Sequence, residues 1–270
     1  MIAALVVIAL TIGALAFAIW WEQERIVFQP SPPPYPDGAP ARRVSFTAED
    51  GTPLHAFVVG DSSHATAHGA VLMFHGNADL AAWRVPWAME LAERTGRMVV
   101  LAEYRGYGGI PGPPSVAGVR TDAEAALAWT RETTGLPMSR IALYGHSLGS
   151  AVAAELAVSH PPEALLLESP FSSARDMARI IIAAPLERLW RLVSRVHYDT
   201  EARVRALDAP VWVVHGTDDL IIPFRMGQTV FGAAKRPATM LPVEGAGHND
   251  VPDAGGEAYW SWATAALDRD

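Results

Sequence analysis

The sequence predicts an α/β fold, with a mostly parallel sheet of about eight strands and helices on both faces. Short runs rich in Val, Leu and Ile alternate with helical segments along residues 42–270. Continuous apolar runs of this kind are typical of strands that are buried on both faces. Polar motifs follow the strands directly. This placement is expected where a ligand binds at the carboxyl ends of a parallel sheet.

The first 21 residues contain no charged side chain. About twenty apolar residues, at about 1.5 Å per residue, cross a hydrocarbon core of roughly 30 Å. Trp20 and Trp21 close the stretch, where interfacial aromatic residues belong. A secretory signal peptide is the alternative, but it would carry a basic N-terminus and a shorter apolar core. We therefore expect residues 1–21 to form a single-pass membrane anchor, on a side of the membrane that the flanking charges leave open.

Residues 22–41 follow the anchor and are rich in proline from residue 30 onward. Proline fixes φ and lacks a backbone N–H, so this part should form neither helix nor sheet. The sequence predicts an extended linker over residues 22–41 and a globular domain over residues 42–270.

The expected elements of the domain follow from its apolar runs and their period. A polar loop is expected between the second and third strands, up to His68. Helices are expected through Trp83 and Leu91 and over residues 116–132, 147–159 and 255–267. Strands are expected at residues 42–48, 54–60, 70–74, 98–102, 140–144, 164–167, 210–214 and 238–243.

Composition excludes several classes of function. The 270 residues, 50% hydrophobic and 19% charged, suit one large domain. A net charge of −8 argues against a nucleic-acid partner. With no cysteine, the chain has no disulfide, thiolate nucleophile or Cys-ligated metal. Metal-ligand spacings, a Walker loop and a dinucleotide fingerprint are also missing from the sequence, so we expect no metal and no cofactor.

The pentapeptide 145–149, Gly-His-Ser-Leu-Gly, joins an apolar strand to an Ala-rich helix. This is the G-x-S-x-G pattern in its strand–turn–helix context. A side chain at Gly145 or Gly149 would collide with the neighbouring strand or helix. The turn should expose the hydroxyl of Ser147 above the sheet as a nucleophile. The free N–H groups at the start of the helix, beginning with Leu148, should stabilise an oxyanion.

A serine nucleophile needs a base, an acid and a second oxyanion donor. His248, in a glycine-rich loop after the last strand, is the expected general base. Asp218 and Asp219 both follow the strand at 210–214 and both qualify as the acid. The order Ser, Asp, His along the chain is the order expected when the nucleophile lies in a strand–turn–helix elbow. The backbone N–H of Asn77, after the strand at 70–74, is the second donor, and His75 should hold its loop.

Seven motifs together resemble the α/β-hydrolase superfamily, and within it the single-pass, membrane-anchored serine hydrolases with a short cap. The resemblance spans nearly the whole chain. It supports Asp219 as the acid, four residues before Pro223, and Asn77 and Leu148 as the oxyanion residues. Asp79, Glu103 and Ser150 depart from the family pattern. The motifs are Phe28-Gln-Pro30, Phe74-His-Gly-Asn-Ala78, Tyr104-Arg-Gly-Tyr-Gly108, Gly145-His-Ser-Leu-Gly149, Glu168-Ser-Pro-Phe-Ser172, His215-Gly-Thr-Asp-Asp219 and Gly247-His-Asn-Asp250.

The resemblance implies a serine hydrolase that cleaves carboxylic esters or thioesters of small or lipid-like acyl substrates through an acyl-enzyme. Amide hydrolysis on the same triad, and a non-catalytic scaffold bound to the membrane, are the alternatives. An insert at about residues 170–200 breaks the strand–helix alternation and is the expected helical cap. Its apolar face, with Leu186, Trp190 and Val196, covers an acyl pocket in one interpretation. In the other, its arginines rest on anionic lipid.

Overall fold

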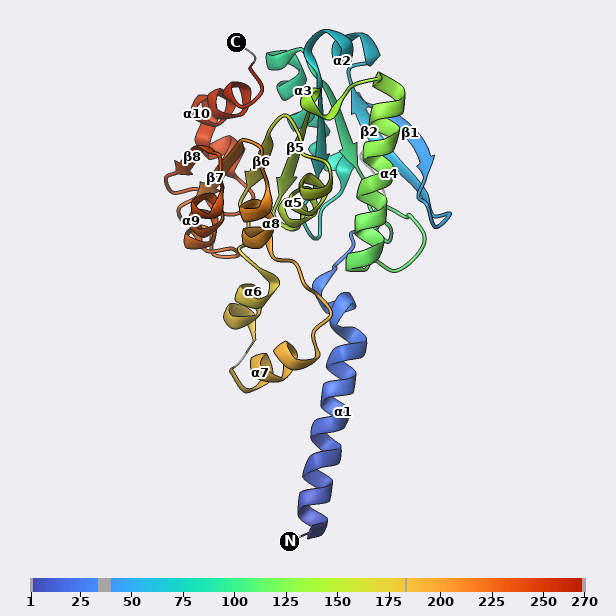
Figure 1. The fold of residues 1–270 in the computed structure, drawn as a ribbon, viewed down its shortest axis with the longest axis vertical. Coiled ribbons are helices and arrows are strands. Elements are labelled where there is room, and N and C mark those ends of the chain that lie inside the picture. The colour runs from blue at the N-terminus through green and yellow to red at the C-terminus, as the bar shows by residue number, and fades with distance from the viewer. Residues whose placement is uncertain (1, 34–39, 183, 269–270) are drawn as a thin grey trace.

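A twisted eight-stranded sheet forms the centre of the computed structural model, which describes residues 2–33, 40–182 and 184–268 (Figure 1). The strand order is β1-β2-β4-β3-β5-β6-β7-β8. β1 and β2 run antiparallel to their neighbours, and every pairing from β4 through β8 is parallel. The strands are β1 (Arg42–Thr47), β2 (Pro53–Val59), β3 (Ala70–Phe74), β4 (Met98–Ala102), β5 (Ile141–His146), β6 (Leu165–Glu168), β7 (Val211–Gly216) and β8 (Pro237–Val243). The predicted fold class is confirmed.

Helices cover both faces of the sheet, which explains why the central strands are apolar throughout. Every residue of β3 and β4 is buried. Leu72 and Val100 point into the core beneath α4 (Val116–Thr134), α5 (Leu148–Ser159), α8 (Thr200–Ala206) and α9 (Phe224–Ala233). Val71 and Val99 point into the opposite core, beneath α3 (Val85–Thr95) and α10 (Val251–Ala265). Two short 3-10 turns, η1 (Ala81–Arg84) and η2 (Met138–Arg140), precede α3 and β5.

The loop predicted between β2 and β3 is in fact a short helix, α2 (Ser62–His68). Its start depends on one carboxylate, because Asp61 Oδ1 accepts hydrogen bonds from the N–H groups of Ser63 (2.8 Å) and His64 (3.2 Å). Ala65 is its one buried side chain. A seven-residue helix with so little apolar pattern leaves no periodic signal in the sequence.

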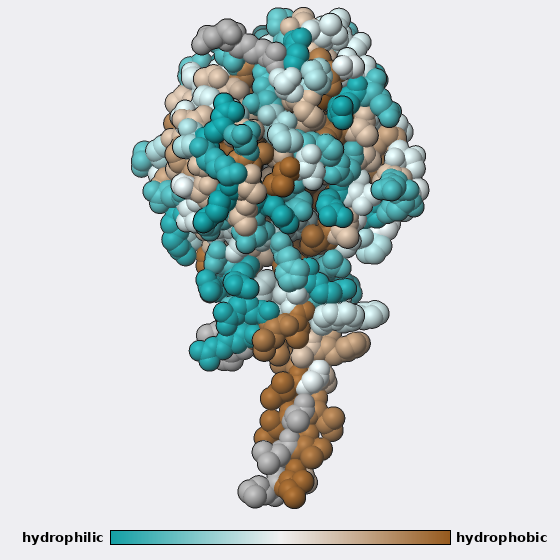
Figure 2. Space-filling view, viewed as in Figure 1, coloured by the Kyte–Doolittle hydropathy of each residue, from teal (hydrophilic) through white to brown (hydrophobic). Residues whose placement is uncertain are grey.

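Helix α1 (Ile2–Val27) projects from the domain as a separate rod (Figure 1). Its length and composition suffice to cross a membrane, and its most apolar window is not buried against the protein. Apolar side chains cover the rod, whereas hydrophilic ones predominate on the visible face of the domain (Figure 2). The helix therefore has the properties expected of an anchor.

The predicted boundary between anchor and linker is wrong. Residues 22–27 continue α1, although the sequence predicts an extended linker from residue 22. Phe28 is only 1% exposed and belongs to the core, where its ring packs edge-on against Tyr198 at 6.3 Å. The polar residues after Trp21 remain helical because they bind the cap and α4. The remainder of the predicted linker falls partly on residues 34–39, which lie outside the described residues.

The insert predicted at about residues 170–200 contains two helices, α6 (Ala174–Ile181) and α7 (Ala184–Val193), between β6 and α8. Both helices lie beyond the carboxyl end of β6, and α7 lies next to α1 (Figure 1). The prediction that Leu186, Trp190 and Val196 form one inward face of the cap helix is partly wrong. Trp190 and Val196 are buried, but Val196 lies beyond the end of α7, and Leu186 is 43% exposed.

Candidate active site

The turn between β5 and α5 holds Ser147 in a conformation that few residues adopt. Its φ is 54° and its ψ is −117°, in the positive-φ region. The flanking glycines are required by space. A Cβ on Gly145 would lie 2.3 Å from the carbonyl oxygen of Gly149, and a Cβ on Gly149 would lie 2.0 Å from that of Phe74. The chain can therefore turn this sharply, and present a strained serine, only with glycine at both positions.

Three side chains from separate loops form a continuous hydrogen-bonded row. The Ser147 hydroxyl lies 2.9 Å from Nε2 of His248, and Nδ1 of His248 lies 2.7 Å from Oδ2 of Asp219. With Nδ1 as the donor to the carboxylate, Nε2 is left as the acceptor for the serine proton. Ser147 and His248 are each 9% exposed, so the row lies just beneath the surface. The structure thus brings together the three residues that the sequence selects.

The carboxylate of Asp219 is held from several sides. Its Oδ1 accepts hydrogen bonds from the N–H groups of Ile221 (2.8 Å) and Ile222 (2.7 Å). Burial acts to raise the pKa of Asp219, but hydrogen bonds from His215 and His248 outweigh it and hold that pKa well below its usual range. Asp218, the other candidate, is exposed and near Thr217 instead. The sequence did not single out His215, whose Nε2 lies 3.2 Å from Asp219.

The loop after β3 runs directly against the serine. A Cβ on Gly76 would lie 3.2 Å from the Cβ of Ser147, so Asn77 follows at the edge of the elbow. Leu148 begins α5, and its N–H is one of the free groups at that helix end. Within the described residues, neither Asn77 nor Leu148 donates its backbone N–H to a protein acceptor. Both donors that the sequence predicts therefore border Ser147 and are unengaged.

A buried ion pair holds this loop from below. His75 Nε2 lies 2.6 Å from Glu103 Oε1, and its Nδ1 lies 2.8 Å from the carbonyl of Gly76. Burial acts to lower the pKa of His75, but Glu103 outweighs it and raises that pKa. Glu103 Oε2 also accepts the N–H of Ala81 at 3.1 Å. The pair fixes both ends of the loop, in line with the structural role expected for His75.

The side chain of Asn77 joins the loop to the end of α1. Its Nδ2 donates to the carbonyl of Val27 at 2.7 Å, and its Oδ1 accepts the N–H of Gln29 at 2.8 Å and the Tyr107 hydroxyl at 2.6 Å. A backbone bond from Ala78 to Gln29 (3.1 Å) closes the contact. The sequence gives no sign of this junction, because its partners are 30 to 50 positions apart.

An ion pair beside the elbow is a second feature that the sequence does not reveal. Arg84 Nε lies 2.6 Å from Asp79 Oδ2, and its Nη2 lies 3.0 Å from Nδ1 of His146. Burial, and then the charge of Arg84, lower the pKa of His146 well below its usual value. His146 is therefore neutral, and its ring lies 5.2 Å from that of His248. Asp79, a departure from the family pattern, thus holds the arginine that helps to keep this neighbour of His248 uncharged.

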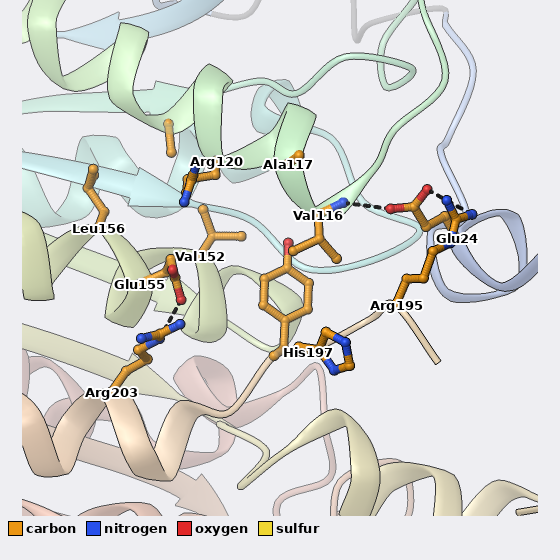
Figure 3. A pocket seen from close by; sticks show the side chains of 12 residues that line it. Glu24, Val116, Ala117, Arg120, Val152, Glu155, Leu156, Arg195, His197 and Arg203 are labelled. Carbon is orange, nitrogen blue, oxygen red and sulfur yellow. Dashed lines mark hydrogen bonds and ion pairs between the residues drawn. The ribbon is translucent and has the colours of Figure 1, made fainter. Parts of the chain in front are cut away.

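A cavity of about 360 Å³ lies beside the junction of α1 with the domain, and none of Ser147, Asp219 and His248 lines it (Figure 3). Glu24 extends into this region from α1. It accepts the N–H of Val116 at 3.2 Å and pairs with Arg195 at 3.8 Å. On the opposite wall Arg203 pairs with Glu155 at 2.6 Å. In the part of the chain that the structure describes, no cluster of His, Asp or Glu side chains is arranged to hold a metal.

Comparisons with known proteins agree with this geometry. The family model described as Serine aminopeptidase, S33 matches residues 65–199, half of the chain. The Alpha/beta hydrolase domain-containing protein WAV2 of Arabidopsis thaliana is 30% identical over 272 residues, covering 92% of this chain and 88% of WAV2. The chain belongs to the α/β-hydrolase superfamily. Another relative of this α/β hydrolase, the uncharacterized protein Rv2307c of Mycobacterium tuberculosis, is 37% identical over 90% of this chain and 86% of its own length.

The relatives with a named activity include a lipase. Lysophosphatidylserine lipase ABHD12 of Danio rerio is 28% identical over 67% of this chain and 51% of its own length. Among solved structures, the Pyrococcus furiosus esterase Pf2001 superposes with a TM-score of 0.66 at 21% identity, covering 88% of this chain and 98% of the esterase. A membrane phospholipase A superposes with a TM-score of 0.62 at 18% identity over 99% of this chain and 96% of its own. The two structural likenesses concern the fold.

Proposed function

We propose that this α/β hydrolase cleaves carboxylic esters or thioesters with lipid-like acyl groups, using Ser147 as the nucleophile. The hydrogen-bonded row from Ser147 through His248 to Asp219, beneath a strained elbow, is the observation that carries the proposal. The strain at Ser147 and the ready acceptor at Nε2 are what acyl transfer needs from a serine.

The reaction proceeds in two halves. Ser147 Oγ attacks the acyl carbonyl carbon while His248 Nε2 takes its proton. The oxygen of the tetrahedral intermediate, now negatively charged, is stabilised by the backbone N–H groups of Asn77 and Leu148. The intermediate collapses as His248 protonates the leaving alcohol or thiol, which leaves an acyl-enzyme on Ser147. A water molecule that is deprotonated by His248 then attacks the acyl carbon. The second tetrahedral intermediate collapses as the bond from the acyl carbon to Ser147 Oγ breaks and His248 returns the proton to Oγ, which releases the free acid.

Asp219 keeps the imidazole in the tautomer that the first half requires. It accepts the Nδ1 proton and stabilises the imidazolium that forms. Because His215 and His248 hold the pKa of Asp219 well below its usual range, the carboxylate stays ionised throughout the reaction. His146 remains neutral beside Arg84, whose guanidinium is paired with Asp79, so the ring next to His248 adds no positive charge of its own.

Two observations favour a lipid-like acyl substrate. Helix α1 is long and apolar enough to place the domain next to a bilayer. A relative with a named activity is a lipase. We infer that the carbonyl to be cleaved belongs to an acyl chain that reaches the site from the membrane side of the molecule.

The test combines active-site labelling with a substrate series. The wild type should be labelled by a fluorophosphonate probe and should hydrolyse p-nitrophenyl esters and matched thioesters of short, medium and long acyl chains. Ser147→Ala should abolish labelling and lower kcat/KM by at least about 10³-fold. Ser159→Ala, at an exposed serine at the end of α5, is the matched control and should change neither. Persistent labelling of Ser147→Ala would place the nucleophile elsewhere.

The alternatives are distinguished in the same assay. The family description names an aminopeptidase, and aminoacyl p-nitroanilides therefore belong in the series. Faster turnover of these amides than of every ester would make the chain a peptidase. A protein that neither reacts with the probe nor turns over any substrate would be the scaffold.

A further inference from the structure

The cap carries four large apolar side chains that the described residues leave exposed. Ile181 is 72% and Leu192 84% exposed, and Ile180 and Leu186 are each 43% exposed. Cap helices usually direct such residues inward, and here Trp190 does so. Because exposing four large aliphatic side chains to water is unfavourable, their grouping on one small insert indicates a contact surface. We call these four residues, together with Arg175 and Arg188, the cap underside.

The cap underside is basic in an acidic protein. Five arginines and two acidic residues occur between residues 174 and 196, although the whole chain has a net charge of −8. Glu187 pairs with Arg191 at 3.3 Å and approaches Arg179 at 4.0 Å. Arg175 and Arg188 are exposed and have no acidic partner within the described residues. Apolar and basic side chains together are the composition that binds an anionic membrane surface.

The position of the cap relative to α1 identifies that surface. Gln23 of α1, which is 1% exposed, donates to the carbonyl of Val193 at 3.4 Å and accepts the N–H of Arg195. Arg195 also donates to the carbonyl of Trp20 at 3.1 Å, and its guanidinium lies 4.4 Å from the Trp20 ring. The end of α7 is therefore fixed at the level of Trp20 and Trp21. Tryptophans at the end of a spanning helix lie at the depth of the lipid headgroups.

The direction of α7 also fits a membrane surface. It runs across α1 rather than along it, so it lies roughly in the plane of a membrane that α1 spans (Figure 1). The apolar surface of α1 also meets apolar and hydrophilic surface of the cap at this level (Figure 2). Helices in this orientation bury one face at the boundary between headgroups and acyl chains, while their arginines extend toward the phosphates.

We propose that the cap underside rests in the headgroup layer of the membrane in which α1 stands, with Ile181 and Leu192 in contact with acyl chains and Arg175 and Arg188 in contact with anionic headgroups. This contact would form whether or not the triad is active. It would hold the exposed apolar side chains of the cap next to lipid instead of water.

Because the chain contains no cysteine, single labels report on single positions. Full-length Leu192→Cys and Ile181→Cys, each carrying an environment-sensitive fluorophore, are placed in nanodiscs of phosphatidylcholine and phosphatidylglycerol. The control is Met89→Cys. Met89 is an apolar residue of α3 that is 40% exposed, and α3 covers the face of the sheet opposite to α4. The proposal expects strong quenching of both cap labels by lipids with a nitroxide near the headgroup, and little quenching at residue 89.

The basic part of the proposal has its own test. Arg175→Gln combined with Arg188→Gln should weaken the quenching at residue 192 in discs that contain phosphatidylglycerol, and should have little effect in discs of phosphatidylcholine alone. Quenching at residues 181 and 192 no stronger than at residue 89 would overturn the proposal. Labels that are shielded from lipid and instead transfer energy to each other would overturn it too, because a second copy of the chain would then cover the surface.

Discussion

The side chain of Asn77 should position the oxyanion loop, and removing it tests whether the end of α1 takes part in catalysis. Asn77→Ala keeps the backbone N–H that is proposed to bind the oxyanion. It removes the hydrogen bonds to Val27, Gln29 and Tyr107. At about 1 kcal/mol net for each bond, the loop loses roughly 3 kcal/mol of support. Since about 1.4 kcal/mol corresponds to a factor of ten, kcat should fall by up to about a hundredfold.

The expected pattern separates this role from a loss of folding. The oxyanion exists only in the intermediate and the transition states around it, so kcat should fall while KM changes little. Tyr107→Phe removes one of the three bonds and should cost about tenfold or less. Both parameters are measured on a p-nitrophenyl ester, alongside the melting temperature. An Asn77→Ala enzyme with the wild-type kcat would refute the reasoning, as would a Tyr107→Phe enzyme that is impaired as severely as Asn77→Ala.

Three further predictions use matched pairs or a defined pH range. Asp219→Asn should lower kcat by about 10³–10⁴-fold, whereas Asp218→Asn should leave steady-state kinetics close to wild type, and equal losses would contradict the assignment. Gly149→Ala should abolish soluble expression or lower the melting temperature sharply because its Cβ would meet backbone at 2.0 Å, whereas Gly232→Ala, whose Cβ meets nothing within 4 Å, should melt like the wild type. Burial and the neighbouring Arg43 lower the pKa of His55 to about 4. The unfolded chain, with a histidine pKa near 6.5, therefore binds this proton more readily, and stability is lost as the pH falls from about 6.5 toward 4. Between about pH 6.5 and about pH 4 the melting temperature of His55→Gln should fall less than that of the wild type. Melting temperatures that fall equally in both proteins would count against this account.

The sequence predicts those parts of the fold and site that depend on short-range rules. The elbow is recognisable because the two glycines, the serine and the flanking strand and helix are adjacent in the chain. The strands are recognisable because residues buried on both faces must be apolar, as in β3 and β4. The choice of Asp219 over Asp218 needed the resemblance to known hydrolases, since both residues follow the same strand. The structure separates them by direction, with one beside His248 and the other exposed.

The features that the sequence does not reveal depend on partners far away in the chain. Residues 22–24 look like the water-exposed flank of an anchor, yet Gln23 is buried because it binds the end of α7, 170 positions later. Arg84 has no motif that would associate it with His146, 62 positions away. The helical pattern through residue 196 gives no indication that α7 ends at Val193. Local periodicity reports which face of a segment is apolar, but not which neighbour, if any, covers that face.

The direct connection between α1 and the loop at Asn77 has a geometric consequence for the substrate. Because Val27 and Gln29 bind the loop without an intervening spacer, the distance from Trp21 to Ser147 is set by a rigid path. With α1 in a bilayer, the nucleophile would stand at one fixed height above the lipid. Esters would then be selected by how far their carbonyl can rise from the membrane as well as by their chemistry. An ester whose carbonyl lies near the membrane surface and one whose carbonyl lies deeper would therefore not be equivalent substrates.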